Sequence, residues 1–178
     1  AMIKDDIEEV KINWVRAAQR ALAAGFEVLE VHGAHGYLIH EFLSPASNKR
    51  TDEYGGSLAN RMRFALEITE AVREVWPQDK PLFFRVSAVD EGGWQLDDTV
   101  VLARELKAIG VDVVDCSASG ISIRSPTASR EKLKPGFQVP FAERVRKDAG
   151  VMSMAVGLIL QARQAEQILA EGRADLVA

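Results

Sequence analysis

The chain has 178 residues, of which 47% are hydrophobic and 27% are charged, a composition typical of one globular domain. Its 22 basic and 26 acidic residues give a net charge of −4, which argues against non-specific binding to nucleic acid or to an anionic membrane. No apolar run approaches the roughly 20 residues that a membrane-spanning helix needs.

Cys116 is the only cysteine, so no disulfide can form within the chain. The first residues also lack the basic and then apolar layout of a secretion signal. We therefore expect a cytoplasmic protein in which Cys116 is a small buried apolar residue.

The first predicted element is an amphipathic helix that ends at Gly25. Apolar residues recur in it at three- and four-residue steps and line one face. Asp5 is expected to cap its start, with Glu8 completing a capping box. Residues 26–32 then form the first predicted strand.

The same order of strand and helix repeats along the rest of the chain. Further helices are predicted over residues 60–75, 97–109, 139–149 and 161–171, and strands over 82–87, 111–116, 152–156 and 174–177. This alternation implies right-handed βαβ units and a parallel sheet. Because no GxGxxG dinucleotide turn is present, a (β/α) barrel is favoured over an open doubly wound sheet.

The predicted strands number about five, whereas a (β/α)8 barrel has eight strands and typically about 250 residues. We therefore predict an α/β fold, a partial TIM (β/α)8 barrel with about five of the eight βα units. Residues 1–178 form one domain that lacks the first strands and the end of the last unit. The unpaired sheet edge predicts either a fragment of a longer protein or closure through self-association as a homo-oligomer.

Two long polar connections, residues 41–56 and 121–138, interrupt the alternation. Loops of this length are uncommon in compact domains unless they serve a site or a partner. Polar or glycine-rich residues also follow each strand, and in parallel α/β folds the carboxyl ends of the strands carry the site. The functional residues are therefore expected at that end.

The strongest local signal is the segment HGAHGYL, residues 32–38. The imidazoles of His32 and His35 can donate hydrogen bonds to a carbonyl or nitro oxygen and stabilise an enolate-like charge. The phenol of Tyr37 is protonated at neutral pH and can act as a general acid. Two alternatives remain open: a zinc site, for which no third ligand is evident, and structural histidines that are satisfied by backbone carbonyls.

Arg85 is the second signal, since it follows an apolar run at the end of a strand. A buried guanidinium is costly without an anionic partner. It either pairs with a carboxylate such as Asp90 or Asp115, or faces an electron-rich ligand such as the N1–O2 edge of a flavin.

The third signal is the strand end Ala155, Val156, Gly157 and Leu158. Backbone N–H groups at such a turn, followed by a helix start, favour phosphate. Phosphate sites in barrels often follow the last two strands.

Three stretches carry a family resemblance. Residues 32–45, HGAHGYLIHEFLSP, resemble the active-site strand and loop of Old Yellow Enzyme family ene-reductases. Residues 48–64, NKRTDEYGGSLANRMRF, look like the most distinctive stretch of that family, and residues 135–142, PGFQVPFA, resemble its bacterial NADPH dehydrogenase and xenobiotic reductase branch. The resemblance covers essentially the whole chain.

This resemblance implies an FMN enzyme that uses NADPH to reduce the C=C bond of activated alkenes, such as enones, and also nitro compounds. His32 and His35 bind the activating oxygen of the substrate, and Tyr37 is a candidate proton donor. Arg85 contacts the flavin ring, and residues 155–158 lie near the FMN phosphate. The first three strands of the family and its Gly-Arg pair after the eighth strand are absent from this sequence.

Two other functions are compatible with these residues. The flavin barrel could belong to a 2,4-dienoyl-CoA reductase or an amine dehydrogenase, relatives that carry an iron–sulfur cluster held by several cysteines. Alternatively, the polypeptide is a non-catalytic barrel fragment that self-associates.

The segment from Arg50 to Ser57 is predicted to be scaffolding rather than chemistry. Arg50 pairs with Asp52, Gly55 and Gly56 turn the chain, and Ser57 caps the following helix.

Overall fold

The computed structural model describes residues 2–121 and 133–178 of the chain. Five parallel strands form one sheet in the order β1-β2-β3-β4-β5, so each strand pairs with its neighbours in the sequence. The strands are β1 (Leu29–Gly33), β2 (Leu82–Ser87), β3 (Val113–Ser117), β4 (Met152–Ala155) and β5 (Leu176–Val177). The α/β fold and the parallel sheet of about five strands are confirmed.

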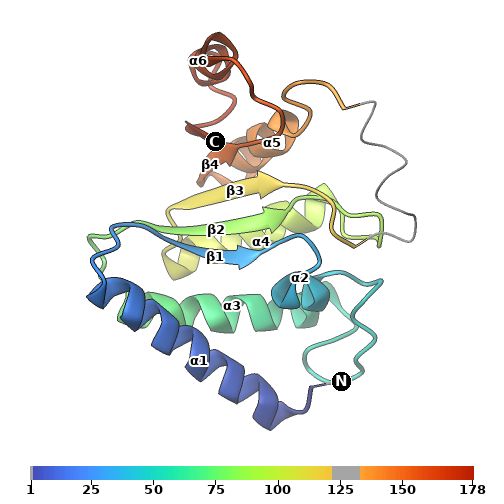
Figure 1. Ribbon diagram of the computed structural model, residues 1–178. Helices are drawn as coiled ribbons and strands as arrows, with labels where there is room; N and C mark the ends of the chain where they lie inside the picture. Colours follow the sequence, from blue (N-terminus) through green and yellow to red (C-terminus); the bar gives the residue numbers. More distant parts are fainter. Residues whose placement is uncertain (1, 122–132) are drawn as a thin grey trace.

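The helices cover one side of this sheet and leave its other face toward the viewer in Figure 1. They are α1 (Lys4–Ala23), α2 (Leu38–Leu43), α3 (Leu58–Val75), α4 (Leu96–Ile109), α5 (Val139–Ala149) and α6 (Ala162–Ala170). Gly110 and Gly150 end α4 and α5 in the left-handed conformation, which glycine adopts without the steric penalty of a side chain. Both predicted ends are therefore confirmed.

Several predicted boundaries are wrong at the start of the chain. Ile3, not Asp5, is the N-cap of α1, because the carboxylate of Asp6 accepts the Ile3 N–H at 2.8 Å and so allows the helix to begin two residues earlier. The strand β1 begins at Leu29 rather than at Phe26, since Phe26 and Val28 are exposed outside the sheet. It also continues one residue further, to Gly33.

The first long connection is not entirely a loop. Residues 38–43 form α2, which buries Ile39, Phe42 and Leu43, so the predicted loop over residues 41–56 begins only after Leu43. Six residues are too few to show a clear helical period, which explains the error. In the second connection, residues 122–132 lie outside the described residues.

The two faces of the sheet differ in chemistry because successive side chains of a strand point to opposite faces. The face packed against the helices is apolar and buried, and includes Val31, Phe84, Val86, Val114 and Cys116. Cys116 has no exposed surface, and burial raises the pKa of its thiol, so the prediction of a buried apolar residue is confirmed.

The opposite face carries polar side chains in a row across the strands. His32 pairs in register with Arg85, and Arg85 with Asp115, so their side chains lie on this same face. The strands β1 to β3 all point toward the side of the molecule that holds α2 (Figure 1). The carboxyl ends of the strands, where the site is expected, therefore converge at one rim.

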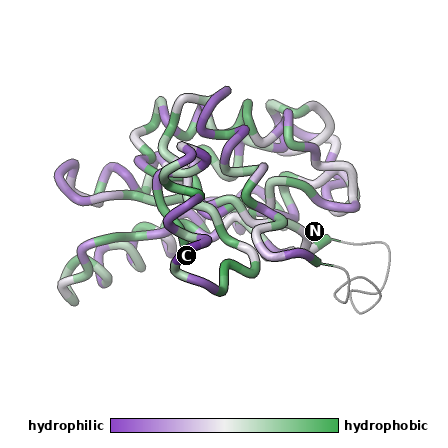
Figure 2. The backbone as a smooth tube through the Cα atoms, turned by 90° about the horizontal axis from the view of Figure 1, so that it is seen from above, coloured by the Kyte–Doolittle hydropathy of each residue, from purple (hydrophilic) through white to green (hydrophobic). Residues whose placement is uncertain are grey.

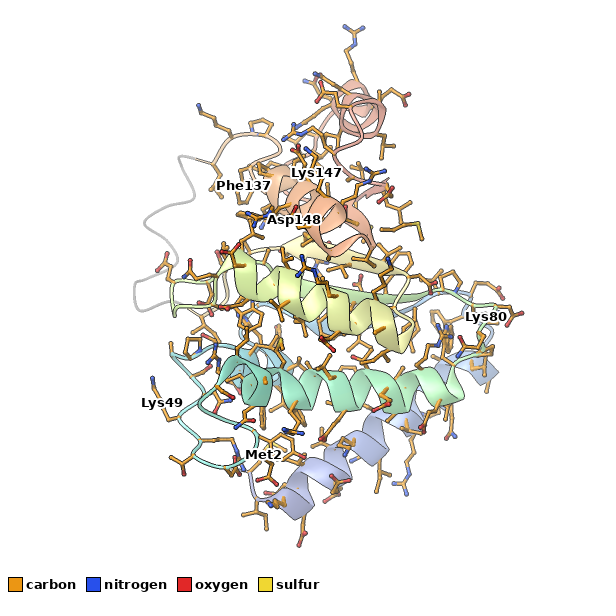
Figure 3. All side chains as sticks on the ribbon, turned by 180° about the vertical axis from the view of Figure 1, so that it is seen from behind. Met2, Lys49, Lys80, Phe137, Lys147 and Asp148 are labelled. Carbon is orange, nitrogen blue, oxygen red and sulfur yellow. The ribbon has the colours of Figure 1, made fainter. Side chains whose placement is uncertain are left out.

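Polar contacts hold the outer layer together. Arg104 of α4 donates two hydrogen bonds to the carbonyl of Asp148 on α5, the helix that lies above it in Figure 3. Arg50 donates to the carbonyl of Met2, which ties the start of the chain to the loop that also carries Lys49 (Figure 3). Hydrophilic and hydrophobic residues alternate along the tube (Figure 2), as expected for helices with one buried face.

Candidate active site

His32, His35 and Tyr37 lie together at the end of β1, with His32 inside the strand and the other two beyond it. The ring centroid of His32 lies 5.3 Å from that of His35 and 5.4 Å from that of Tyr37. His35 has a left-handed backbone, with φ 59°, so its side chain turns back toward the sheet. Tyr37 is 66% exposed and occupies the N-cap position of α2, with no side-chain hydrogen bond to the helix. The structure therefore brings these three side chains to one rim.

His35 is held by serines from two other strands. Its backbone N–H donates to Ser87 Oγ at 3.0 Å, and its ring Nε2 lies 2.7 Å from Ser117 Oγ. Ser117 also accepts a long hydrogen bond of 3.4 Å from the Gln138 amide. The ends of β1, β2 and β3 are thus tied together around one imidazole.

Arg85 lies beside His32 and in front of Asp115. Its Nε is 3.2 Å from Asp115 Oδ2, an ion pair that is too oblique to form a hydrogen bond. Among the described residues, no hydrogen bond reaches the terminal nitrogens of Arg85, and both carboxylate oxygens of Asp115 are buried without one. The Asp115 partner foreseen for Arg85 is confirmed, whereas Asp90 pairs with His40.

Burial and positive charge set the protonation of this rim. Burial, helped by the charge of Arg85, lowers the pKa of both His32 and His35, so both rings are neutral at pH 7. Burial also raises the pKa of Asp115 to about 6, although Arg85 acts in the opposite direction. The rim therefore presents two neutral imidazoles and one guanidinium.

The strand end at residues 155–158 forms a second part of the rim. Gly157 and Leu158 both have a left-handed backbone, with φ 106° and 54°, and α6 follows a few residues later. The carbonyl of Gly157 accepts from Gly136 N–H at 2.8 Å, whereas the N–H groups of Gly157 and Leu158 have no acceptor among the described residues. Successive N–H groups left free at such a turn suit an anion.

The geometry bears on the two alternative roles of His32 and His35, as zinc ligands or as structural histidines. Within residues 2–121 and 133–178, no group of three or more His, Cys, Asp or Glu side chains could hold a metal ion. The ring of His35 is satisfied on one nitrogen by Ser117, but no described residue makes a hydrogen bond to the ring of His32. A purely structural role therefore accounts for only part of the pair.

Several residues at the rim were not assigned a role from the sequence. Gln138 lies at the contact between Ser117 and Gly157, where a Cβ on Gly157 would meet its Oε1 at 2.6 Å. His40 is fully buried, and its Nδ1 accepts the N–H of Gly36 at 2.9 Å. The partner of Gln138 lies 21 positions away in the sequence, so no linear pattern reveals it, whereas His40 and Gly36 are only four positions apart.

The contacts predicted for residues 50–57 are confirmed, and the scaffolding role of the segment stays a prediction. Arg50 and Asp52 form a close pair, with Nη2 and Oδ2 2.6 Å apart. Gly56 has φ 81°, and Ser57 Oγ accepts the N–H of Asn60 at the start of α3.

Comparison with known proteins decides the family. The sequence profile of the NADH:flavin oxidoreductase / NADH oxidase family matches residues 1–178. The chain belongs to this family. An NADPH dehydrogenase of Geobacillus sp. (strain WCH70) is 51% identical over an alignment 178 residues long, and the match covers 99% of this chain and 50% of that protein. The chain thus spans about half the length of the curated relatives that it matches.

Solved structures of this flavin oxidoreductase family share the fold. A 2-naphthoyl-CoA reductase in complex with 2-naphthoyl-CoA matches with a TM-score of 0.90 and 32% identity over 99% of this chain and 27% of the other. Morphinone reductase matches with a TM-score of 0.78 and 30% identity over 100% and 46%. An old yellow enzyme homologue from Zymomonas mobilis, at 24% identity and a TM-score of 0.79 over 100% and 49%, shares the fold. The predicted family and partial barrel are confirmed.

Proposed function

We propose that this flavin oxidoreductase family member is an FMN-dependent NAD(P)H oxidoreductase that reduces the C=C bond of activated alkenes, with NADPH as the reductant. The observation that carries this proposal is the gathering of His32, His35, Tyr37 and Arg85 at one rim. The identity of 51% with an NADPH dehydrogenase supports NADPH as the reductant. Enones and nitro compounds are the proposed substrates.

The residues present fit FMN in two places. The guanidinium of Arg85, held from behind by Asp115, suits the electron-rich edge of an isoalloxazine ring. The N–H groups of Gly157 and Leu158 suit a phosphate, and Ala155 and Val156 lead the strand to that turn. When bound, FMN supplies hydride transfer, which no amino-acid side chain can supply.

The residues of the chain then act on the substrate. The neutral rings of His32 and His35 donate N–H groups to its carbonyl or nitro oxygen and so stabilise the negative charge that develops there. Tyr37, exposed beside His32, donates a proton to carbon. The serines behind His35 keep its ring in place, which lowers the cost of ordering on binding.

A spectroscopic experiment tests this function. Expressed from its full gene, the protein is expected to purify with a flavin absorbance spectrum and to oxidise NADPH when cyclohexenone is added. Replacing both His32 and His35 by alanine should sharply weaken phenol binding, measured from the change in flavin absorbance. A Thr69→Val control removes a buried hydrogen bond within α3, far from the rim, and should leave phenol binding unchanged. Unaltered binding in the double variant would remove the role assigned to the histidines.

A second candidate is the reduction of an unsaturated coenzyme A thioester. The TM-score of 0.90 with a 2-naphthoyl-CoA reductase favours it, although the identity of 32% is lower than that with the NADPH dehydrogenase. Oxidation of NADPH with an enoyl-CoA thioester, but not with cyclohexenone, would favour this candidate.

We also propose that residues 1–178 are part of one FMN-binding barrel domain that works in the cytoplasm and self-associates as a homo-oligomer. The presence of a single cysteine supports a reducing compartment such as the cytoplasm. The uncovered polar face of the sheet supports a partner that covers it, such as a second copy of the chain. A small-molecule substrate, rather than nucleic acid or membrane, fits the net charge of −4. None of the described helices is long and apolar enough to cross a membrane.

A further inference from the structure

A fully buried contact between a histidine and an aspartate joins α2, which follows β1, to the loop that leaves β2. His40 Nε2 lies 3.2 Å from Asp90 Oδ2, and neither side chain has any exposed surface. Two ionisable groups are costly to bury unless their contacts compensate for lost hydration. The proposed reaction uses neither side chain. Their other polar contacts are with the surrounding backbone.

The backbone determines which nitrogen of His40 carries the proton. Gly36 N–H donates to His40 Nδ1 at 2.9 Å, so this nitrogen holds a lone pair and the ring proton sits on Nε2, facing Asp90. The other carboxylate oxygen of Asp90 accepts the N–H groups of Gly92 and Trp94 at 2.8 and 2.9 Å. Burial by itself would raise the pKa of Asp90, but the donors around it, His40 foremost, hold that pKa below its usual value. The carboxylate is therefore charged and faces Nε2 of His40, although the contact is too oblique to form a hydrogen bond. The ring proton is placed on Nε2 by the Gly36 N–H, which occupies Nδ1.

We propose that His40 is a positioning residue for the reaction proposed above. Its ring holds the backbone amide of Gly36, the residue between His35 and Tyr37, against the loop that follows β2. The contact stabilises a turn in which His35 and Gly36 both adopt left-handed conformations, with φ 59° and 79°. This inference rests on the proposed function, since it concerns where that site holds its two donors.

Two substitutions separate the two contacts of His40. In His40→Asn, the side-chain oxygen replaces Nδ1 and still accepts from Gly36, whereas the contact with Asp90 is lost. In His40→Gln, the longer amide still faces Asp90 but no longer accepts from Gly36. Thr69→Val serves as the matched control for the loss of a buried hydrogen bond elsewhere. Phenol affinity of the FMN-loaded protein and the 15N spectrum of its imidazoles are measured for each variant.

We expect the wild-type spectrum at pH 7 to show His40 protonated on Nε2 alone. His40→Gln should weaken phenol binding about tenfold, because a buried amide loses its acceptor and the turn loses its hold. His40→Asn and Thr69→Val should stay within about threefold of the wild type. A proton on Nδ1, or unchanged phenol affinity in His40→Gln, overturns the positioning role. A wild-type protein that takes up FMN but binds no phenol contradicts the proposed function. The positioning role, which depends on that function, is then overturned with it.

Discussion

The ring nitrogen Nε2 of His35 lies 2.7 Å from Ser117 Oγ, so the end of β3 holds a side chain from the turn after β1. The Gln138 amide donates to the same serine oxygen, which leaves the Ser117 hydroxyl hydrogen free to point at His35. When Ser117 donates to Nε2, the proton of the neutral ring lies on Nδ1, where it can be donated to a ligand. We expect the contact with Ser117 to favour this tautomer of His35.

Ser117→Ala is expected to weaken phenol binding by the FMN-loaded protein about three- to tenfold, the usual range for a neutral hydrogen bond. Titration of the flavin absorbance with phenol measures this. Ser153→Ala is the matched control, because Ser153 is a fully buried serine on the helix-covered face of the same sheet. Equal phenol affinities in the two variants would contradict the role of Ser117.

Asp115 is expected to give the stability of the protein a distinct pH dependence. Burial raises its pKa to about 6, whereas an unfolded chain has a value of about 3.9. The folded state therefore binds this proton more tightly, and its free energy of unfolding falls as pH rises from about 4 to about 6. The size of this effect is roughly 3 kcal/mol.

Urea unfolding of the wild type and of Asp115→Asn at pH 4, 5, 6 and 7 measures this effect. Asparagine cannot titrate, so the wild type should lose stability relative to the variant across that range. Carboxylates with a lowered pKa, such as Asp52, change stability in the opposite direction but do so equally in both proteins. Two parallel curves would show that Asp115 does not titrate in this range.

Gly36 is expected to tolerate no side chain. Comparison with Gly56 separates the effect of a steric clash from that of backbone strain. Gly36 has φ 79°, and a Cβ on it would lie 2.5 Å from the carbonyl oxygen of Gly120, in the loop after β3. Gly56 has nearly the same φ, 81°, but a Cβ there would meet nothing within 4 Å. Both alanine variants carry similar backbone strain, so the difference between them reports the clash alone.

We expect Gly36→Ala to lower the free energy of unfolding by about 2 kcal/mol more than Gly56→Ala does, as measured by urea titration. Phenol binding should fall only in the Gly36 variant, because relief of the clash moves the turn that carries His35. Equal losses of stability would mean that the two loops can separate without cost.

Tyr54→Phe tests whether the segment around residues 50–57 is only scaffolding. The Tyr54 hydroxyl donates to Glu67 Oε2 at 3.0 Å, and burial together with Glu67 raises the pKa of the phenol to about 12. The ring is buried edge-on against Phe42, a contact that phenylalanine keeps. The variant should lose about 1 kcal/mol of stability in urea and keep its affinity for FMN and phenol. A marked loss of FMN affinity at unchanged stability would assign this segment to the site.

The sequence by itself determined the alternation of strands and helices and the rim at which the candidate site residues gather. The bounds of β2 and of α5 were predicted correctly, as were the ends of α4 and α5 at Gly110 and Gly150. These features depend on local physics: side-chain periodicity, the backbone freedom of glycine and the common direction of parallel strands. The short helix α2 was missed because its period is too brief to recognise.

Only the tertiary structure decided which partners hold the functional side chains. Ser117 lies 82 positions from His35, and Asp90 lies in the loop after β2 whereas His40 lies in α2, yet each pair is in contact. Among the carboxylates that the sequence offered to Arg85, the register between β2 and β3 selected Asp115. The physical reason is that burial and hydrogen bonding depend on separation in space, which a linear pattern specifies only through the direction of the strands.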